Sequence, residues 1–174
     1  MNPIRLSGVI RQSIVDGPGL RFVVFTQGCP HNCPDCHNPQ THDFTGGYDA
    51  TADKLLAAYD ENPLLKGITL SGGEPFCQNE SGLLGLTALA QGIHARGGDV
   101  YSFSGYTFEE LLALSAENPA IKALLSQLDI LIDGRYVASQ RDLTLRFRGS
   151  ANQRIIDVPT SLAAGAATWA QLPN

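Results

Sequence analysis

Short apolar segments typical of buried strands alternate along this chain with helical segments, and most of them run into glycine. The strand-like segments are RFVVFTQ (21–27), GITLSG (67–72), VYSFSG (100–105) and DILIDG (129–134). The helical segments between them are TADKLLAAYDEN (51–62), roughly 80–96, FEELLALS (108–115) and AIKALLSQ (120–127). This alternation predicts βαβ units and a largely parallel sheet. We therefore expect a single α/β domain over residues 1–174.

Four polar or glycine-rich segments follow the predicted strands. They are the cysteine-bearing loop 28–44, SGGEP (71–75), SFSGY (102–106) and DGRY (133–136). In parallel sheets the ligand lies at the carboxyl ends of the strands, so we expect these segments to form one site.

The composition excludes several classes of protein. Of 174 residues 43% are hydrophobic and 17% are charged, with a formal net charge of −5, which indicates a soluble globular protein. Mild acidity gives no reason to expect nucleic acid or membrane as a partner. The N-terminus lacks the apolar stretch of a signal peptide, so we expect a cytoplasmic protein with reduced thiols.

The loop GCPHNCPDCHNP holds three of the four cysteines, Cys29, Cys33 and Cys36. They could be free thiols, although three exposed thiols invite oxidation. They could bind zinc with His37, although adjacent residues chelate one tetrahedral ion poorly. They could also bind three irons of a [4Fe–4S] cluster and leave the fourth iron open, which is the interpretation we favour. Cys77 follows an apolar residue and is expected to be a buried thiol outside the ligand set.

The spacing Cys-x₃-Cys-x₂-Cys, joined to SGGEP after a later strand, resembles the radical S-adenosylmethionine (SAM) superfamily. The resemblance implies a partial (β/α) barrel in which the methionine end of SAM chelates the open iron. It also implies reductive cleavage of SAM to a 5′-deoxyadenosyl radical. The cofactor-binding candidates are Ser71, Gly72, Gly73, Glu74, Pro75 and Ser104. The glycines would let backbone approach the ligand, and Glu74 would accept hydrogen bonds from its ammonium group. Asp35 stands where the superfamily often has an aromatic residue.

Further segments resemble the activating enzymes of glycyl-radical proteins, and above all the activating family of anaerobic ribonucleotide reductase. They are VDGPGLR (15–21), CHNPQT (36–41), GYTFEELL (105–112), DILIDGRY (129–136) and FRGSANQRIIDV (147–158). The resemblance covers residues 13–158. It implies that the chain generates a glycyl radical on a partner enzyme, most directly the anaerobic reductase, with a flavodoxin or ferredoxin as reductant.

Other functions remain open at this stage. A pyruvate formate-lyase-type activase would use an aspartate like Asp16 for a monovalent cation, but the Ser102-Phe103-Ser104 region offers no acidic partner, and Asp16-Gly17 also fits a turn. The chain could instead act on a free metabolite, as a 7-carboxy-7-deazaguanine synthase does, or serve as an electron carrier or zinc-stabilised module.

The C-terminal segment 145–174 is the least defined by its sequence. We expect short strands at 145–148 and 155–158. Four polar side chains there, Arg148, Asn152, Gln153 and Arg154, fit two interpretations equally well. They either face a partner or close the site, or they only hold the C-terminal segment in place.

Overall fold

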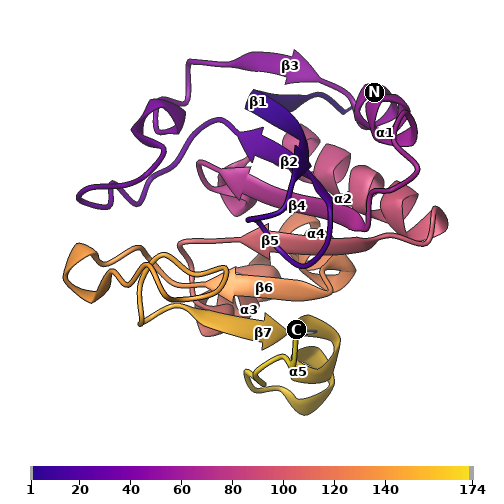
Figure 1. Ribbon diagram of the computed structural model, residues 1–174. Helices are drawn as coiled ribbons and strands as arrows, with labels where there is room; N and C mark the ends of the chain where they lie inside the picture. The colour runs from indigo at the N-terminus through magenta and orange to yellow at the C-terminus, as the bar shows by residue number, and fades with distance from the viewer. Residues whose placement is uncertain (1, 173–174) are drawn as a thin grey trace.

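The structure, a computed structural model, describes residues 2–172 and contains one seven-stranded sheet (Figure 1). The strands are β1 (Ile4–Ser13), β2 (Arg21–Thr26), β3 (Tyr48–Ala50), β4 (Gly67–Gly72), β5 (Asp99–Phe103), β6 (Ile130–Asp133) and β7 (Arg154–Asp157). Their order in the sheet is β3-β1-β2-β4-β5-β6-β7. The helices are α1 (Ala52–Asp60), α2 (Glu80–Ala95), α3 (Phe108–Glu117), α4 (Pro119–Gln127) and α5 (Val158–Ala164).

The four central strands β2, β4, β5 and β6 are parallel, which confirms the expected α/β class and its open, partial (β/α) barrel. They are nearly continuous apolar runs, and most of their residues are buried. The outer strands β1, β3 and β7 pair antiparallel to their neighbours. The carboxyl ends of the four parallel strands therefore meet at one end of the sheet, where the cysteine loop also lies (Figure 1).

The helices cover one face of the sheet, and the main core lies between them and the strands (Figure 1). Fully buried side chains from both layers, such as Ile68, Leu70, Leu86 and Leu124, meet there. Local signals start the helices as the sequence predicts. Thr107 and Glu110, for example, form a complete capping box at the start of α3. No helix among residues 2–172 is long and apolar enough to cross a membrane.

The other face of the sheet carries a smaller core of Tyr101, Ile130, Ile132 and Ile155. The C-terminal tail closes part of this face, since Ala170 and Leu172 pack against that cluster. In the described part of the chain no helices pack on this face (Figure 1).

The structure corrects part of the sequence-based assignment. Residues 145–148 form an irregular loop and not a strand, although the alternation of Leu145, Arg146, Phe147 and Arg148 resembles one. The strand expected at 155–158 is present as β7. Strands β1 and β3 and helix α5 were not expected. The last two residues of the segment 145–174 lie outside the described residues.

Candidate metal and cofactor site

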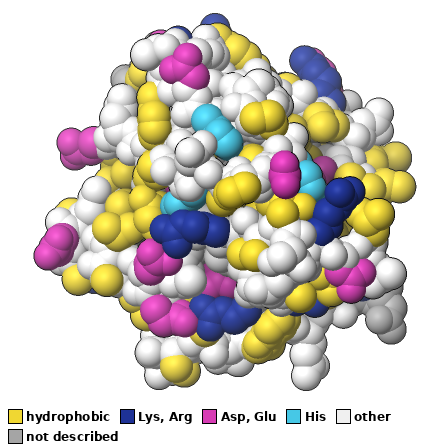
Figure 2. Space-filling model, turned by 90° about the vertical axis from the view of Figure 1, so that its left-hand side faces the viewer, with side chains coloured by type: hydrophobic (Ala, Val, Ile, Leu, Met, Phe, Trp, Pro, Cys, Tyr) yellow, Lys and Arg dark blue, Asp and Glu magenta, His cyan; other side chains and the backbone are white. Residues whose placement is uncertain are grey.

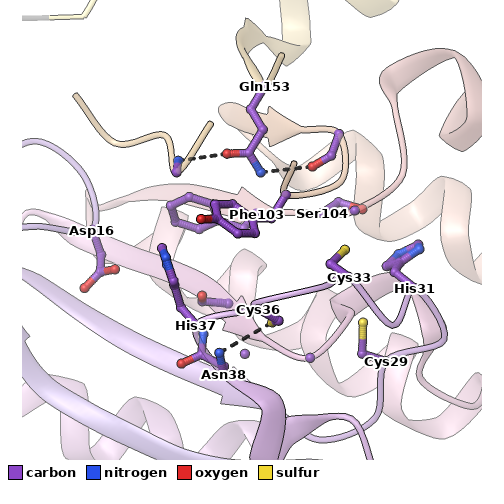
Figure 3. Close-up of a pocket in the computed structure, with 17 residues that line it drawn as sticks. Asp16, Cys29, His31, Cys33, Cys36, His37, Asn38, Phe103, Ser104 and Gln153 are labelled. Atoms are coloured by element: carbon purple, nitrogen blue, oxygen red, sulfur yellow. Dashed lines mark hydrogen bonds between the residues drawn. The ribbon is translucent and has the colours of Figure 1, made fainter. Parts of the chain in front are cut away.

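The three clustered cysteines line one cavity at the carboxyl end of the sheet (Figure 3). The loop that carries them leaves β2 at Gly28 and winds tightly, because Asn32 and Asp35 between the cysteines adopt left-handed backbone conformations with φ of 49° and 57°. Asparagine and aspartate tolerate this conformation better than most residues. Each short turn brings the next thiol back toward the same cavity.

Backbone groups lie close to all three thiols. The amide of Asn38 donates a hydrogen bond to Cys36 Sγ at 3.4 Å, and the backbones of His31 and Tyr136 hydrogen-bond to Cys29 and Cys33. These donors stabilise sulfur that carries negative charge, as ligating thiolates do. Burial nevertheless raises the pKa of Cys29 to about 11, and it raises the pKa of Cys33 as well. Thiolates in this site therefore need a compensating positive charge, which iron would supply.

The donor geometry fits a cluster better than a single ion. Among residues 2–172, no three His, Cys, Asp or Glu side chains converge on a point where one metal ion could bind. The His37 ring packs on Tyr136 with the ring centroids 4.8 Å apart, and both residues line the cavity. A Cys₃His zinc site would need four donors around one ion. In a [4Fe–4S] cluster each thiolate binds a different iron, so the thiols need not converge.

The two glycines of SGGEP lie where β4 reaches the cysteine loop, and both line the cavity with Ser71. A Cβ on Gly73 would stand 2.4 Å from the carbonyl oxygen of Gly28. Gly72 has a φ of +99°, and its Cβ would meet the Thr26 backbone at 2.5 Å. The sequence suggested close approach of a ligand, but here the close approach is between these glycines and the backbone that leads into the cysteine loop.

Glu74 differs from its expected role. Its carboxylate is fully buried and accepts hydrogen bonds from the Phe76 amide (3.1 Å), the Gly105 amide (2.7 Å) and Ser104 Oγ (2.9 Å). His31 Nε2 lies 2.7 Å from the same carboxylate. With these partners around it, Glu74 joins the cysteine loop to the ends of β4 and β5 instead of reaching toward an ammonium group in the cavity. Pro75 beside it is also buried.

Cys77 lies apart from the three clustered thiols. Its sulfur is 3.0 Å from the Tyr106 hydroxyl, and the Tyr106 ring in turn packs edge-on against His31 with centroids 4.6 Å apart. The thiol is half-buried rather than fully buried, and burial raises its pKa. These contacts make Cys77 part of the packing behind the cysteine loop.

Asp16 reaches the cavity from the loop between β1 and β2, opposite the cysteines (Figure 3). Ser13 Oγ donates to its carboxylate at 2.5 Å, and its carbonyl accepts from Thr69 at 2.8 Å. The loop is tied down by Arg21, a fully buried cation that pairs with Asp99 at 2.7 Å. The sequence marked VDGPGLR by resemblance only, and nothing in it indicated that Arg21 is internal.

The four polar residues near the C-terminus hold that segment in place. Gln153 donates to the Gly134 carbonyl at 3.0 Å and accepts from the Gly149 amide at 2.8 Å. Arg148 donates to the Gln153 carbonyl, and Asn152 to the Arg135 carbonyl. Arg154 pairs with the nearly fully buried Asp133.

The cavity wall also includes residues to which the sequence assigned no individual role. Phe103 and Tyr136 lie in SFSGY and DGRY, two of the segments expected to form the site, and Gly149 lies in FRGSANQRIIDV. Gln153 lines the cavity as well.

Comparison with known proteins agrees with this site. A family described as a 4Fe-4S single cluster domain matches residues 15–156. The anaerobic ribonucleoside-triphosphate reductase-activating proteins of Salmonella typhi and Escherichia coli K12 are 37% and 35% identical over 147 residues, which are 80% of this chain and 90% of each relative. The solved structure of QueE from Escherichia coli aligns with a TM-score of 0.49 and 16% identity, over 60% of this chain and 54% of that one. The expected family and its [4Fe–4S] cluster are thus confirmed: this chain belongs to the anaerobic ribonucleoside-triphosphate reductase-activating proteins.

Proposed function

We propose that this chain is a radical SAM enzyme that generates a glycyl radical on an anaerobic ribonucleoside-triphosphate reductase. One observation carries the proposal: three thiols, each with a backbone group close by, line a single cavity at the carboxyl ends of four parallel strands. Three thiolates leave one iron of a [4Fe–4S] cluster open to an exogenous ligand.

Each residue of the site has a proposed role. Cys29, Cys33 and Cys36 bind three irons. Ser71 and the backbone of Gly72 and Gly73 face the methionine end of SAM in the cavity, while Ser104, Glu74 and Pro75 fix the position of that backbone from behind. Bound together, the reduced cluster and SAM supply the radical chemistry that removes a hydrogen atom from a glycine Cα of the partner. The protein orients these groups and keeps water away from them.

The remaining requirements follow from this chemistry. The cluster needs electrons one at a time, and we propose a flavodoxin or ferredoxin as their source. We place the protein in the cytoplasm, where thiols stay reduced until iron binds them. The cavity wall lacks a second carboxylate near Asp16, so we assign no cation site there.

The ligand set is tested by anaerobic reconstitution followed by iron and sulfide analysis. The wild-type chain should hold about four irons and four sulfides. Alanine at Cys29, Cys33 or Cys36 should abolish the cluster, whereas Cys77→Ala should keep it. One zinc per chain, or loss of the cluster in Cys77→Ala alone, contradicts the assignment.

The reaction is tested with the reductase, SAM and a reductant. Electron paramagnetic resonance should then detect an organic radical on the reductase, and replacing the partner's radical-bearing glycine by alanine should remove it. If the isolated chain instead consumes SAM rapidly and modifies a small pterin or nucleobase, the alternative of a metabolite enzyme is correct.

A further inference from the structure

A second hollow continues the cluster cavity outward along the surface. His37, Phe103 and Gly149 line both hollows, so this second hollow, the outer groove, lies directly beside the cluster cavity. The outer groove is bounded by Val15 on one side and by the loop 141–148 on the other. An extended chain lying in this outer groove would therefore lead directly to the thiols.

The rim of the outer groove is unusually apolar for an exposed surface. Leu143 is 84% exposed, Ile14 75% and Val15 72%. Among the large apolar side chains of residues 2–172, only Leu64, at 77%, is comparably exposed. Val15 and Leu143 both line the outer groove. Apolar side chains gathered at one place on a surface mark a site that another molecule covers.

The same rim is positively charged in a chain whose net charge is −5. Residues 135–148 hold four of its twelve Lys and Arg residues and one acidic residue, Asp142. The Asp142 carboxylate is engaged by Thr144 within the loop. Arg141 is exposed, and within the described part of the chain its guanidinium has no hydrogen-bond or ion-pair partner. Figure 2 views this end of the molecule and shows basic and hydrophobic side chains intermingled on it.

The backbone of the rim is held in an uncommon conformation. Phe147 has a φ of +62°, which is rare for a bulky residue. The segment after it is fixed by Gln153, whose side chain accepts from the Gly149 and Ser150 amides. Strained backbone held by its surroundings tends to occur at functional sites. The rim is thus shaped in advance of binding, which lowers the conformational entropy that the rim itself loses when a segment binds.

We propose that the outer groove seats an extended, acidic segment of the reductase that flanks its radical-bearing glycine. Apolar side chains of this segment lie against Val15 and Leu143, and a carboxylate pairs with Arg141. The segment's path places the glycine at the cluster cavity. This inference rests on the function proposed above and adds to it the chemistry of the recognised segment.

The test compares charge and polarity changes at the rim with the same changes elsewhere. Arg141→Glu and Leu143→Asp alter the rim, whereas Lys122→Glu on α4 and Leu64→Asp before β4 are matched exposed controls. All four should keep wild-type iron content and wild-type SAM cleavage with dithionite alone. The rim variants should raise the KM for the reductase about tenfold or more, while the controls stay within about twofold. Higher salt should weaken wild-type binding and change that of Arg141→Glu less.

The outcomes separate this proposal from the function itself. If the wild-type chain neither binds nor activates the reductase, the proposed function fails. If it activates the reductase and the rim variants bind as tightly as the controls, the groove proposal is overturned while the function stands. If Leu143→Asp converts a dimer into a monomer in light scattering and leaves the KM unchanged, the groove holds a second copy of the chain, and the proposal is likewise overturned. Restored binding of Arg141→Glu by an acidic-to-lysine change in the reductase segment would support it directly.

Discussion

At the scale of single residues, the site depends on how closely Gly73 approaches the cysteine loop. Its Cβ position is blocked on two sides by backbone carbonyls, those of Gly28 at 2.4 Å and Thr41 at 2.8 Å. Backbone yields less easily than the end of a side chain. Glycine is therefore required at this position by the packing of the protein itself, whether or not a cofactor is bound.

We expect Gly73→Ala to displace the cysteine loop. Overpacking of this kind costs about 1–3 kcal/mol, and iron bound after reconstitution should fall several-fold. Gly8→Ala is the control, because nothing lies within 4 Å of the Cβ position of Gly8. Iron content and urea unfolding of the cluster-free protein measure the two effects. An alanine at 73 that alters SAM affinity alone would show that the loop tolerates the added methyl group.

Glu74 supports a second prediction at this scale. A glutamine there has one accepting oxygen in place of two, although the Phe76 amide, the Gly105 amide and the Ser104 hydroxyl all donate to this carboxylate. It also removes the negative charge beside His31. Hydrogen bonds to a charged acceptor contribute about 1.5–3 kcal/mol, so Glu74→Gln should destabilise the cluster-free protein by about that amount. Hydrogen exchange should then show faster opening of residues 28–44. Unchanged exchange in that loop would refute the idea that Glu74 anchors it.

At the scale of secondary-structure elements, Arg154 fastens β7 to its neighbours. Its guanidinium pairs with Asp133, 1% exposed at the end of β6, and with the half-exposed Glu109 on α3. Asp133 also accepts a hydrogen bond from the Phe108 amide at the start of α3. One cation thus joins two strands and a helix.

Removing Arg154 should cost far more than removing its exposed partner. Arg154→Ala leaves the Asp133 carboxylate buried without its counter-ion, which costs about 3–5 kcal/mol. Glu109→Ala removes only a solvent-screened pair and should cost about 1 kcal/mol or less. Chemical unfolding of the cluster-free variants measures both changes. Equal losses of stability in the two variants would show that a buried Asp133 without its counter-ion costs no more than the loss of the exposed pair.

The pair between Arg154 and Glu109 should make the free energy of unfolding depend on pH. Hydrogen bonds from Arg154 lower the pKa of Glu109 below its ordinary value of 4.5. A carboxylate with a lowered pKa stabilises the fold above that ordinary value and loses this contribution as the pH falls through the lowered one. The difference in unfolding free energy between wild type and Glu109→Gln should therefore be present at pH 7, begin to shrink near pH 4.5 and disappear once the pH is below the lowered pKa. A difference that grew in acid would contradict the pairing.

The elements predicted well from the sequence are those with the strongest local signals. The parallel strands are continuous apolar runs, and the α3 helix carries a complete capping box. Strand β3 was missed because it has three residues, two of them exposed. The 145–148 segment was misassigned because its alternating pattern imitates a half-buried strand, while Arg148 and the adjacent Gly149 form hydrogen bonds with Gln153 in place of strand pairing.

The candidate site shows the same limit of local reasoning. The cysteine spacing and SGGEP were visible as patterns, so the sequence could locate the cavity. The partners of Glu74 come from three separate strand ends and could not be paired without the fold.

At the scale of the whole molecule, the C-terminal tail completes the far edge of the sheet. Trp169 forms an antiparallel β-bridge with Ile156, and the Ala170 amide donates to the Ile155 carbonyl. Leu172 packs on the smaller core. Without the tail, β7 would present unpaired backbone groups, which favour edge-to-edge association. The single sheet also supports the expectation of one domain, which stays a prediction.

Ending the chain at Ala166 should therefore lower the melting temperature by about 5 °C or more and promote self-association. Trp169→Ala keeps the backbone pairing and should retain the oligomeric state of the full chain. Light scattering after size-exclusion chromatography compares them. A shortened chain that stays as monodisperse as the full chain would show that the β7 edge is not exposed by the deletion.

The contacts that hold the cysteine loop in place do not involve the metal. The hydrogen bond between Glu74 and His31 and the close packing of Gly72 and Gly73 against backbone are formed by protein atoms alone. We therefore expect a chain that has lost its cluster to oxygen to stay folded around the site. Once its three thiols are reduced again, such a chain should take up iron and sulfide, so the cell need not synthesise it anew.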